Sequence, residues 1–340
     1  MSEIITEVID VAEPPKRIFI VPYRNRLQQK FFFCQQMNFI LEGVNDYEIL
    51  FVHQMDSRPF NRGATKNIGF LAMKEKYPDT YKDITFIFND VDTLPFHKLF
   101  DYQTVLGTVK HYYGFDSALG GIVVIKGQDF ELVNGYPSYW GWGMEDACLQ
   151  NRCLYNKIKI DRSQFYPIGS PEILQLFDGV ERLVSPKDPQ RMKQDRGIDG
   201  LKTIHKLTYT IDKESANPAD NKYIVPDQDR VFYVNVASFM TLVHFESDQY
   251  HQYDLREPVR KVSFPDSGKM VNPTTFVNSP TDWKNIPTMS TPTMSMPQPR
   301  YPSHQQHQRL IQQNPFSQQA NKNYPVRASK SVNIGMGGRY

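Results

Sequence analysis

Short apolar runs alternate with longer segments of helical spacing through the first part of the chain. Residues 17–22, 47–53 and 83–88 are compact hydrophobic runs, which are typical of buried strands. Between them, residues 27–41 and 62–77 carry apolar side chains at helical intervals. A strand–helix–strand order of this kind predicts an α/β fold, in which helices cover a parallel sheet.

The same reading continues beyond residue 100, although the pattern is weaker there. Residues 167–200 show no periodicity, and we interpret them as irregular. The elements expected in this part are strands at residues 120–125, 207–211 and 230–238 and helices at residues 127–134 and 148–155.

Composition divides the chain into three parts. We expect a flexible N-terminus at residues 1–15, a catalytic domain at residues 16–250 and a low-complexity tail at residues 251–340. Pro, Ser, Thr, Gln, Asn and Met dominate the tail, which indicates disorder. Such a tail is either a plain linker or a docking segment for an unknown protein partner.

Charge and hydropathy exclude several classes of protein. The 39 basic and 37 acidic residues leave a net charge of +2, which gives no basis for expecting a nucleic-acid partner. The three cysteines form no disulfide or zinc pattern. No apolar run approaches the roughly 18 residues of a membrane span, and we see no signal peptide, so we expect a soluble, cytoplasmic protein.

Two carboxylates follow the third apolar run. Asp90 and Asp92 flank Val91 directly after that run, where the carboxyl end of a strand opens into the ligand crevice of an α/β sheet. Successive residues of an extended segment point to opposite sides, so we expect one carboxylate to coordinate Mn²⁺ or Mg²⁺ and the other to orient a ligand. A solvated acidic turn or a helix cap is the alternative interpretation.

A second candidate site joins aromatic and acidic residues. Trp140 and Trp142 alternate with glycines and lead directly to Glu145 and Asp146. Exposed indole rings can stack on a sugar, the glycines permit loop movement, and a carboxylate can take a proton from a hydroxyl. The alternative interpretation is a buried aromatic cluster followed by the charged start of a helix, which would have the same sequence.

These motifs occur together and in order, and in this combination the chain resembles the β-1,4-galactosyltransferase family, including its N-acetylgalactosaminyl and chondroitin-type relatives. The resemblance covers residues 17–238 and implies a GT-A-type nucleotide-sugar-binding fold with a mostly parallel sheet flanked by helices. The pieces that carry it are VPYRNR at 21–26, FNRG at 60–63, NIGF at 67–70, DVD at 90–92, GG at 120–121 and WGWGMED at 140–146.

The resemblance also implies roles for individual residues. Asp146 corresponds to the catalytic base, with Glu145 and Trp142 beside it, and Trp142 and Arg191 correspond to acceptor-binding positions. Asp92 corresponds to a metal ligand. The positions that correspond to the donor site are Pro22, Tyr23, Arg24, Arg26, Phe60, Arg62, Asp90, Ala118, Gly120 and Gly121. The implied activity is inverting, metal-dependent transfer of galactose or N-acetylgalactosamine from a UDP-sugar to a carbohydrate hydroxyl.

Three departures from the family pattern bear on specificity. Ala147 replaces a further acidic residue that helps to hold the acceptor. No histidine lies between Asp146 and His205, which leaves Asp178, or the more distant His244, as a second metal ligand. Ala118 replaces a tyrosine of the galactose-specific members, and we expect the smaller side chain to admit N-acetylgalactosamine.

Three functional classes follow from these observations. An active, soluble glycosyltransferase of bacterial or viral type agrees with the presence of the expected catalytic base, the tryptophan loop and the aspartate expected to bind the metal. A non-catalytic module that binds a nucleotide sugar or glycan would explain the missing histidines. A scaffold that acts through its tail is the third.

Overall fold

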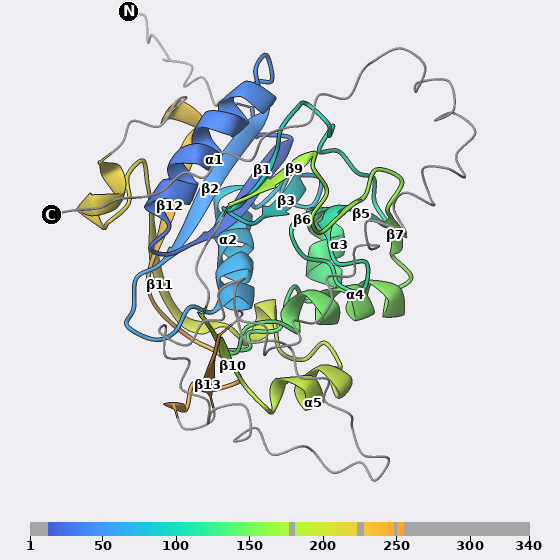
Figure 1. Cartoon of the computed structure of the whole chain (residues 1–340), viewed down its shortest axis with the longest axis vertical. Coiled ribbons are helices and arrows are strands. Elements are labelled where there is room, and N and C mark those ends of the chain that lie inside the picture. The colour runs from blue at the N-terminus through green and yellow to red at the C-terminus, as the bar shows by residue number, and fades with distance from the viewer. Residues whose placement is uncertain (1–12, 177–180, 223–227, 248–249, 255–340) are drawn as a thin grey trace, which may run out of the picture. The chain divides into compact units, whose positions relative to one another are not determined.

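The computed structural model describes residues 13–176, 181–222, 228–247 and 250–254. Its main sheet has the strand order β11-β12-β2-β1-β3-β6-β5-β7, and β8 pairs with β5. Neighbouring strands are parallel from β12 through β2 and β1 to β3, whereas β6 is antiparallel to both β3 and β5. The α/β class and the largely parallel centre of the sheet are confirmed (Figure 1).

The bounds of the elements agree with most of the predicted segments. The helices are α1 (Leu27–Ile40), α2 (Arg62–Lys76), α3 (Gly127–Leu132), α4 (Glu145–Tyr155) and α5 (Asp188–Lys193), with short 3₁₀ turns at Leu201–Thr203, Pro218–Asn221 and Gln228–Arg230. The strands are β1 (Arg17–Tyr23), β2 (Tyr47–Gln54), β3 (Thr85–Asn89), β4 (Thr93–Pro95), β5 (Thr108–Gly114), β6 (Ile122–Lys126), β7 (Lys159–Asp161), β8 (Tyr166–Pro167), β9 (Ile173–Gln175), β10 (Glu181–Val184), β11 (His205–Asp212), β12 (Val231–Met240) and β13 (His251–Asp254).

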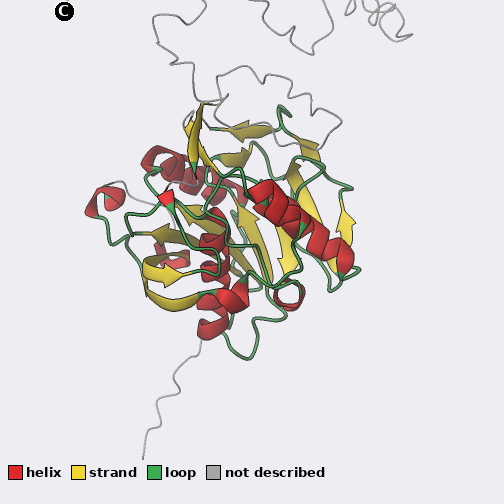
Figure 2. Cartoon of the chain, turned by 90° about the horizontal axis from the view of Figure 1, so that it is seen from below, coloured by secondary structure: helices red, strands yellow, loops and turns green. Residues whose placement is uncertain are grey.

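Alternate side chains of the central strands enter two different cores. Ile18 and Ile20 of β1 pack in the cluster that includes Ile68 of α2. Phe19 of the same strand packs in the other cluster, with Phe33 of α1. The two helices therefore cover opposite faces of the sheet, as Figure 2 shows, and the continuously apolar runs reflect burial on both faces.

The structure differs from the predicted segments in several places. Strands β4, β5, β7 and β8 lie in segments where we predicted no element, and α4 begins three residues before the predicted helix at 148. Residues 167–200, interpreted as irregular, contain β9, β10 and α5. Strand β13, just past position 250, pairs with β10, and the domain bounds stay a prediction. Long-range pairing, which has no local sequence signature, stabilises these strands.

Some predictions fall outside the described residues. These are the structure of residues 1–12 and of the tail from 255 onwards. Within the described ranges, no helix has both the length and the apolar character needed to cross a bilayer. The cytoplasmic location stays a prediction.

Candidate active site

A cavity of about 610 Å³ lies where the ends of several elements meet. Pro22, at the end of β1, and Arg24 and Arg26 just after it form one wall. The acidic segment after β3 and the first turn of α4 line other parts of the cavity. In open α/β sheets, ligands bind at the carboxyl ends of strands, which is where this cavity is found.

Helix α2 presents Arg62 to the cavity from its first turn. Asn61 caps the helix, because its side-chain oxygen accepts a hydrogen bond of 2.9 Å from the backbone amide of Ala64. One terminal nitrogen of the Arg62 guanidinium lies 2.6 Å from a carboxylate oxygen of Glu145 and 2.6 Å from one of Asp146, and its Nε donates to Asp90 at 3.3 Å. Arg62 therefore joins three carboxylates from two separate segments, one from the loop after β3 and two from the start of α4.

Asp146 is held by two cations. Besides its contact with Arg62, it accepts a hydrogen bond of 3.0 Å from the buried Nζ of Lys66. Burial by itself raises the pKa of a carboxylate, but the positive charges of Arg62 and Lys66 outweigh that effect and hold the pKa of Asp146 below its usual value. Asp146 is consequently ionised at neutral pH.

Glu145 has the opposite environment. Only 3% of the residue is exposed, and its Oε2 has no hydrogen-bond partner among the described residues. Burial and the neighbouring charge of Asp146 raise the pKa of Glu145, although Arg62 partly offsets them. Adjacent carboxylates whose pKa values are pushed apart are a common arrangement for acid–base chemistry.

Two glycines allow the chain to pass close beneath Asp146. A Cβ on Gly120 would lie 2.5 Å from the Asp146 carboxylate, and Gly121 has a φ of +68°, so a side chain at either position would clash or strain the backbone. His111, which we did not single out from the sequence, supports this turn, because its Nε2 donates to the carbonyl of Gly120 at 3.0 Å. Ala118 also lines the cavity.

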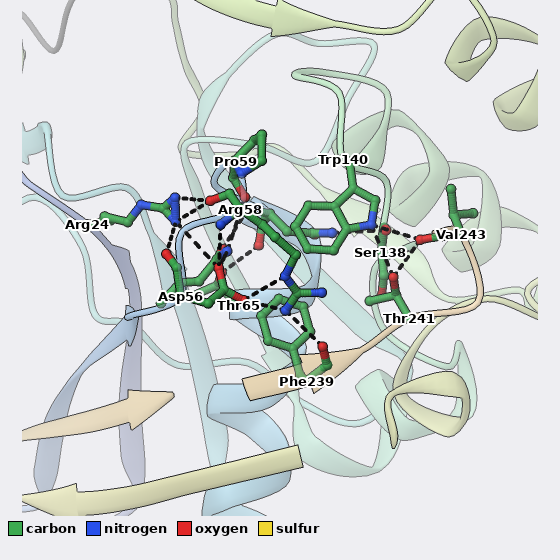
Figure 3. Close-up of polar contacts among 12 residues, drawn as sticks. Arg24, Asp56, Arg58, Pro59, Thr65, Ser138, Trp140, Phe239, Thr241 and Val243 are labelled. Carbon is green, nitrogen blue, oxygen red and sulfur yellow. Dashed lines mark hydrogen bonds and ion pairs between the residues drawn. The ribbon is translucent and has the colours of Figure 1, made fainter. Parts of the chain in front are cut away.

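The two tryptophans have different environments. Trp140 is buried, and its indole nitrogen donates to the carbonyl of Val243 at 2.8 Å (Figure 3). Trp142 lines the cavity with 47% of its surface exposed, and the guanidinium of Arg182 lies 5.6 Å from its ring centroid. The buried-cluster interpretation therefore applies to Trp140, whereas ligand stacking by Trp142 stays a prediction.

Asp92 is the carboxylate best placed for a metal ion. It lines the cavity, and Thr93 donates a hydrogen bond of 3.0 Å to its Oδ1. Gln175, a further lining residue that sequence reasoning missed, pairs with Thr93 across β4 and β9, and its amide oxygen accepts a hydrogen bond of 2.7 Å from the hydroxyl of Tyr113. In the described ranges no three His, Cys, Asp or Glu side chains gather to hold a metal ion, and Asp178 lies outside those ranges.

This donor set still fits Mg²⁺ or Mn²⁺. Such ions commonly use one or two protein oxygens and take their other ligands from phosphate groups and water. Asp92, with Gln175 beside it, meets that requirement.

Two other predicted site residues are not brought into the cavity. Tyr23 is fully buried, and its hydroxyl donates to Asp220 at 2.8 Å, so its side chain does not line the cavity. Arg191 is not a lining residue either, because its guanidinium pairs with Asp188 at 2.7 Å on α5. Phe60 does line the cavity, 5.9 Å from the guanidinium of Arg24.

Comparison with known proteins agrees with this geometry. Residues 10–104 match the family model described as the N-terminal region of glycosyl transferase group 7. Residues 102–174 match the model described as the N-terminal domain of galactosyltransferase. The cavity at the strand ends and these matches define the chain as a glycosyltransferase.

Among curated proteins, xylosylprotein 4-beta-galactosyltransferase of Caenorhabditis elegans is 28% identical over 212 residues, which are 58% of this chain and 72% of that protein. Beta-1,4-galactosyltransferase 1 of Bos taurus is 30% identical over 231 residues, which are 64% of this chain. The match spans 56% of the bovine protein's length. These matches support the β-1,4-galactosyltransferase family for this chain.

A solved structure is similar at lower identity. The catalytic domain of Drosophila beta1,4galactosyltransferase 7 in complex with xylobiose is 21% identical, and the match covers 65% of this chain and 93% of that one, with a TM-score of 0.48.

Proposed function

We propose that this protein transfers galactose or N-acetylgalactosamine from a UDP-sugar to a hydroxyl of a carbohydrate acceptor, with inversion at the anomeric carbon. The observation that carries the proposal is the meeting of three groups in one cavity. These are the ionised carboxylate of Asp146, the arginine-bearing end of β1 and the acidic segment after β3. Named relatives are galactosyltransferases, which supports the same reaction class.

The donor would lie along the wall made by β1 and α2. Arg24 and Arg26 offer fixed positive charge to a diphosphate, and Phe60 offers a flat apolar face to the uracil ring. Asp92, with Gln175, would hold a divalent cation, whose charge stabilises the departing diphosphate. Ala118 leaves space beside the donor sugar, which supports acceptance of an acetamido group.

Asp146 would act as the general base. It would take the proton of the acceptor hydroxyl while that oxygen forms its bond to the anomeric carbon and the bond from that carbon to the UDP oxygen breaks. The half-exposed ring of Trp142 would stack on the acceptor sugar. Glu145, whose pKa is raised, would stay protonated, so the proton of the acceptor hydroxyl would pass to Asp146.

A UDP-release assay tests the proposal. UDP-galactose and UDP-N-acetylgalactosamine would each be supplied with Mn²⁺, with Mg²⁺ or with a chelator, together with a panel of sugar acceptors. We expect metal-dependent UDP release that falls by ~10²- to 10⁴-fold in Asp146→Asn, with UDP affinity retained. Asp116→Asn is the matched control, because this exposed carboxylate does not line the cavity.

The stereochemistry of the product gives a second readout. Inversion predicts a β-linked product from an α-linked donor, which the anomeric proton coupling in NMR reports. Full turnover by Asp146→Asn, or no UDP release from either donor by the wild-type protein, contradicts the proposal. The second result favours a module that binds a nucleotide sugar without turning it over.

A further inference from the structure

Lys66 is a buried lysine beside the acidic cluster that Asp90, Glu145 and Asp146 form around Arg62. It lies one helical turn after Arg62 on α2, and only 1% of the residue is exposed. Its Nζ lies 3.0 Å from Oδ1 of Asp146 and 4.4 Å from the ring centroid of Tyr136. Burial of an ammonium group costs free energy unless the group is paired with an opposite charge. The pairing with Asp146 therefore indicates what Lys66 does.

We propose that Lys66 is a positioning residue that keeps the Asp146 carboxylate ionised and correctly oriented for the transfer reaction. This inference rests on the proposed function. Arg62 contacts Oδ2 of Asp146 and Lys66 contacts Oδ1, so the two cations hold different oxygens of one carboxylate. The plane of that carboxylate is thereby set from α2.

Charge balance gives a second argument. The three carboxylates of Asp90, Glu145 and Asp146 face two cations, Arg62 and Lys66. A buried cluster is most stable near neutrality, and burial raises the pKa of Glu145, so the cluster balances when Glu145 is protonated and Asp146 is ionised. Without Lys66, of these two cations only Arg62 remains beside the three carboxylates. A second carboxylate would then retain its proton.

The other titratable groups near Asp146 do not supply that charge. His111 lies beneath the Gly120 turn, and burial lowers its pKa to about 4, so its imidazole is neutral when the enzyme works. Burial raises the pKa of Tyr136, which is also neutral. Lys66 itself does not line the cavity, so its loss should leave the donor contacts in place.

The pH profile of kcat/KM for Lys66→Met tests the proposal. We expect the acid limb to move to higher pH by about one unit, which is a roughly tenfold loss at pH values on the acid side of the limb and little loss well above it. KM for the UDP-sugar should change little. Lys66→Arg keeps the charge and should restore the wild-type limb, whereas Lys66→Gln keeps a donor without the charge and should behave as Lys66→Met does.

Lys30→Met is the matched control. Lys30 is equally buried, but its amine donates to the hydroxyl of Tyr233 at 2.8 Å, away from the cavity. Its removal should lower activity by the same factor at every pH, and circular dichroism would show whether each variant folds. An unchanged acid limb in both Lys66→Met and Lys66→Gln overturns the role of Lys66. Full activity in Asp146→Asn overturns the proposed function instead.

Discussion

The guanidinium of Arg58 lies over the ring of Trp140, with 4.6 Å between the guanidinium carbon and the ring centroid. The same guanidinium lies 4.5 Å from the ring centroid of Phe239, and its Nε donates to Asp56 at 2.8 Å (Figure 3). The backbone carbonyl of Arg58 accepts a hydrogen bond of 2.7 Å from Arg24. One residue therefore links the end of β1 to the buried base of the tryptophan loop.

Arg58→Met should destabilise the fold. The variant loses the Asp56 ion pair and two cation–π contacts, for an expected loss of about 1–3 kcal/mol in the free energy of unfolding, measured by urea titration. Lys82→Met serves as the control, because exposed Lys82 has a single longer contact of 5.9 Å with the ring of Tyr81. Equal losses of unfolding free energy in the two variants would show that the contacts of the Arg58 guanidinium stabilise the fold no more than those of an exposed lysine.

Asp92→Asn should weaken the binding of the divalent cation. Because an amide binds a hard divalent ion less strongly than a carboxylate does, we expect the Mn²⁺ concentration for half-maximal UDP release to rise at least about tenfold. Glu181→Gln, which alters another carboxylate lining the cavity, should leave that concentration unchanged. A normal Mn²⁺ titration in Asp92→Asn would remove Asp92 from the ligand set.

Ala118→Tyr should shift donor preference towards galactose. A large side chain at this cavity position would occupy the space proposed for the acetamido group, so the ratio of kcat/KM values for UDP-N-acetylgalactosamine over UDP-galactose should fall about tenfold or more. Ser117→Tyr adds the same ring at an exposed neighbour outside the cavity and should leave the ratio unchanged. An unaltered ratio in Ala118→Tyr would place the acetamido group elsewhere.

Acid should destabilise the fold through His111. Its imidazole stays neutral in the folded protein down to a pKa of about 4, whereas an unfolded histidine takes up a proton near pH 6.5. The unfolded chain thus binds more protons between these values, and stability is lost as pH falls through that window. Between pH 7 and 4.5 the wild type should lose about 2–3 kcal/mol more than His111→Asn.

Urea unfolding at both pH values checks this expectation. His205→Asn changes an exposed histidine and should keep the pH dependence of the wild type. If His111→Asn also keeps it, the buried imidazole is not the group responsible.

Local pattern predicted the strands and helices whose ends line the cavity. The runs that became β1, β2 and β3 are apolar because both of their faces are buried, and that property is visible in the letters alone. Strand β5 was missed because its sequence, TVKHYYG, is neither a continuous apolar run nor a strict alternation, and its partners β7 and β8 lie much further along the chain. The early start of α4 had a signal in Glu145 and Asp146, since acidic residues favour the first helical turn.

The sequence by itself determined the α/β class and indicated the family and the candidate site residues, because hydrophobic periodicity and ordered motifs are properties of neighbouring residues. Only the tertiary structure decided which of those residues meet. Lys66 and Asp146 are 80 positions apart, yet they form one ion pair because α2 and α4 converge on the same cavity. Tyr23 turns away from the cavity because buried Asp220 requires a hydrogen-bond donor. Contacts between distant segments depend on how the elements pack, and no local pattern encodes that.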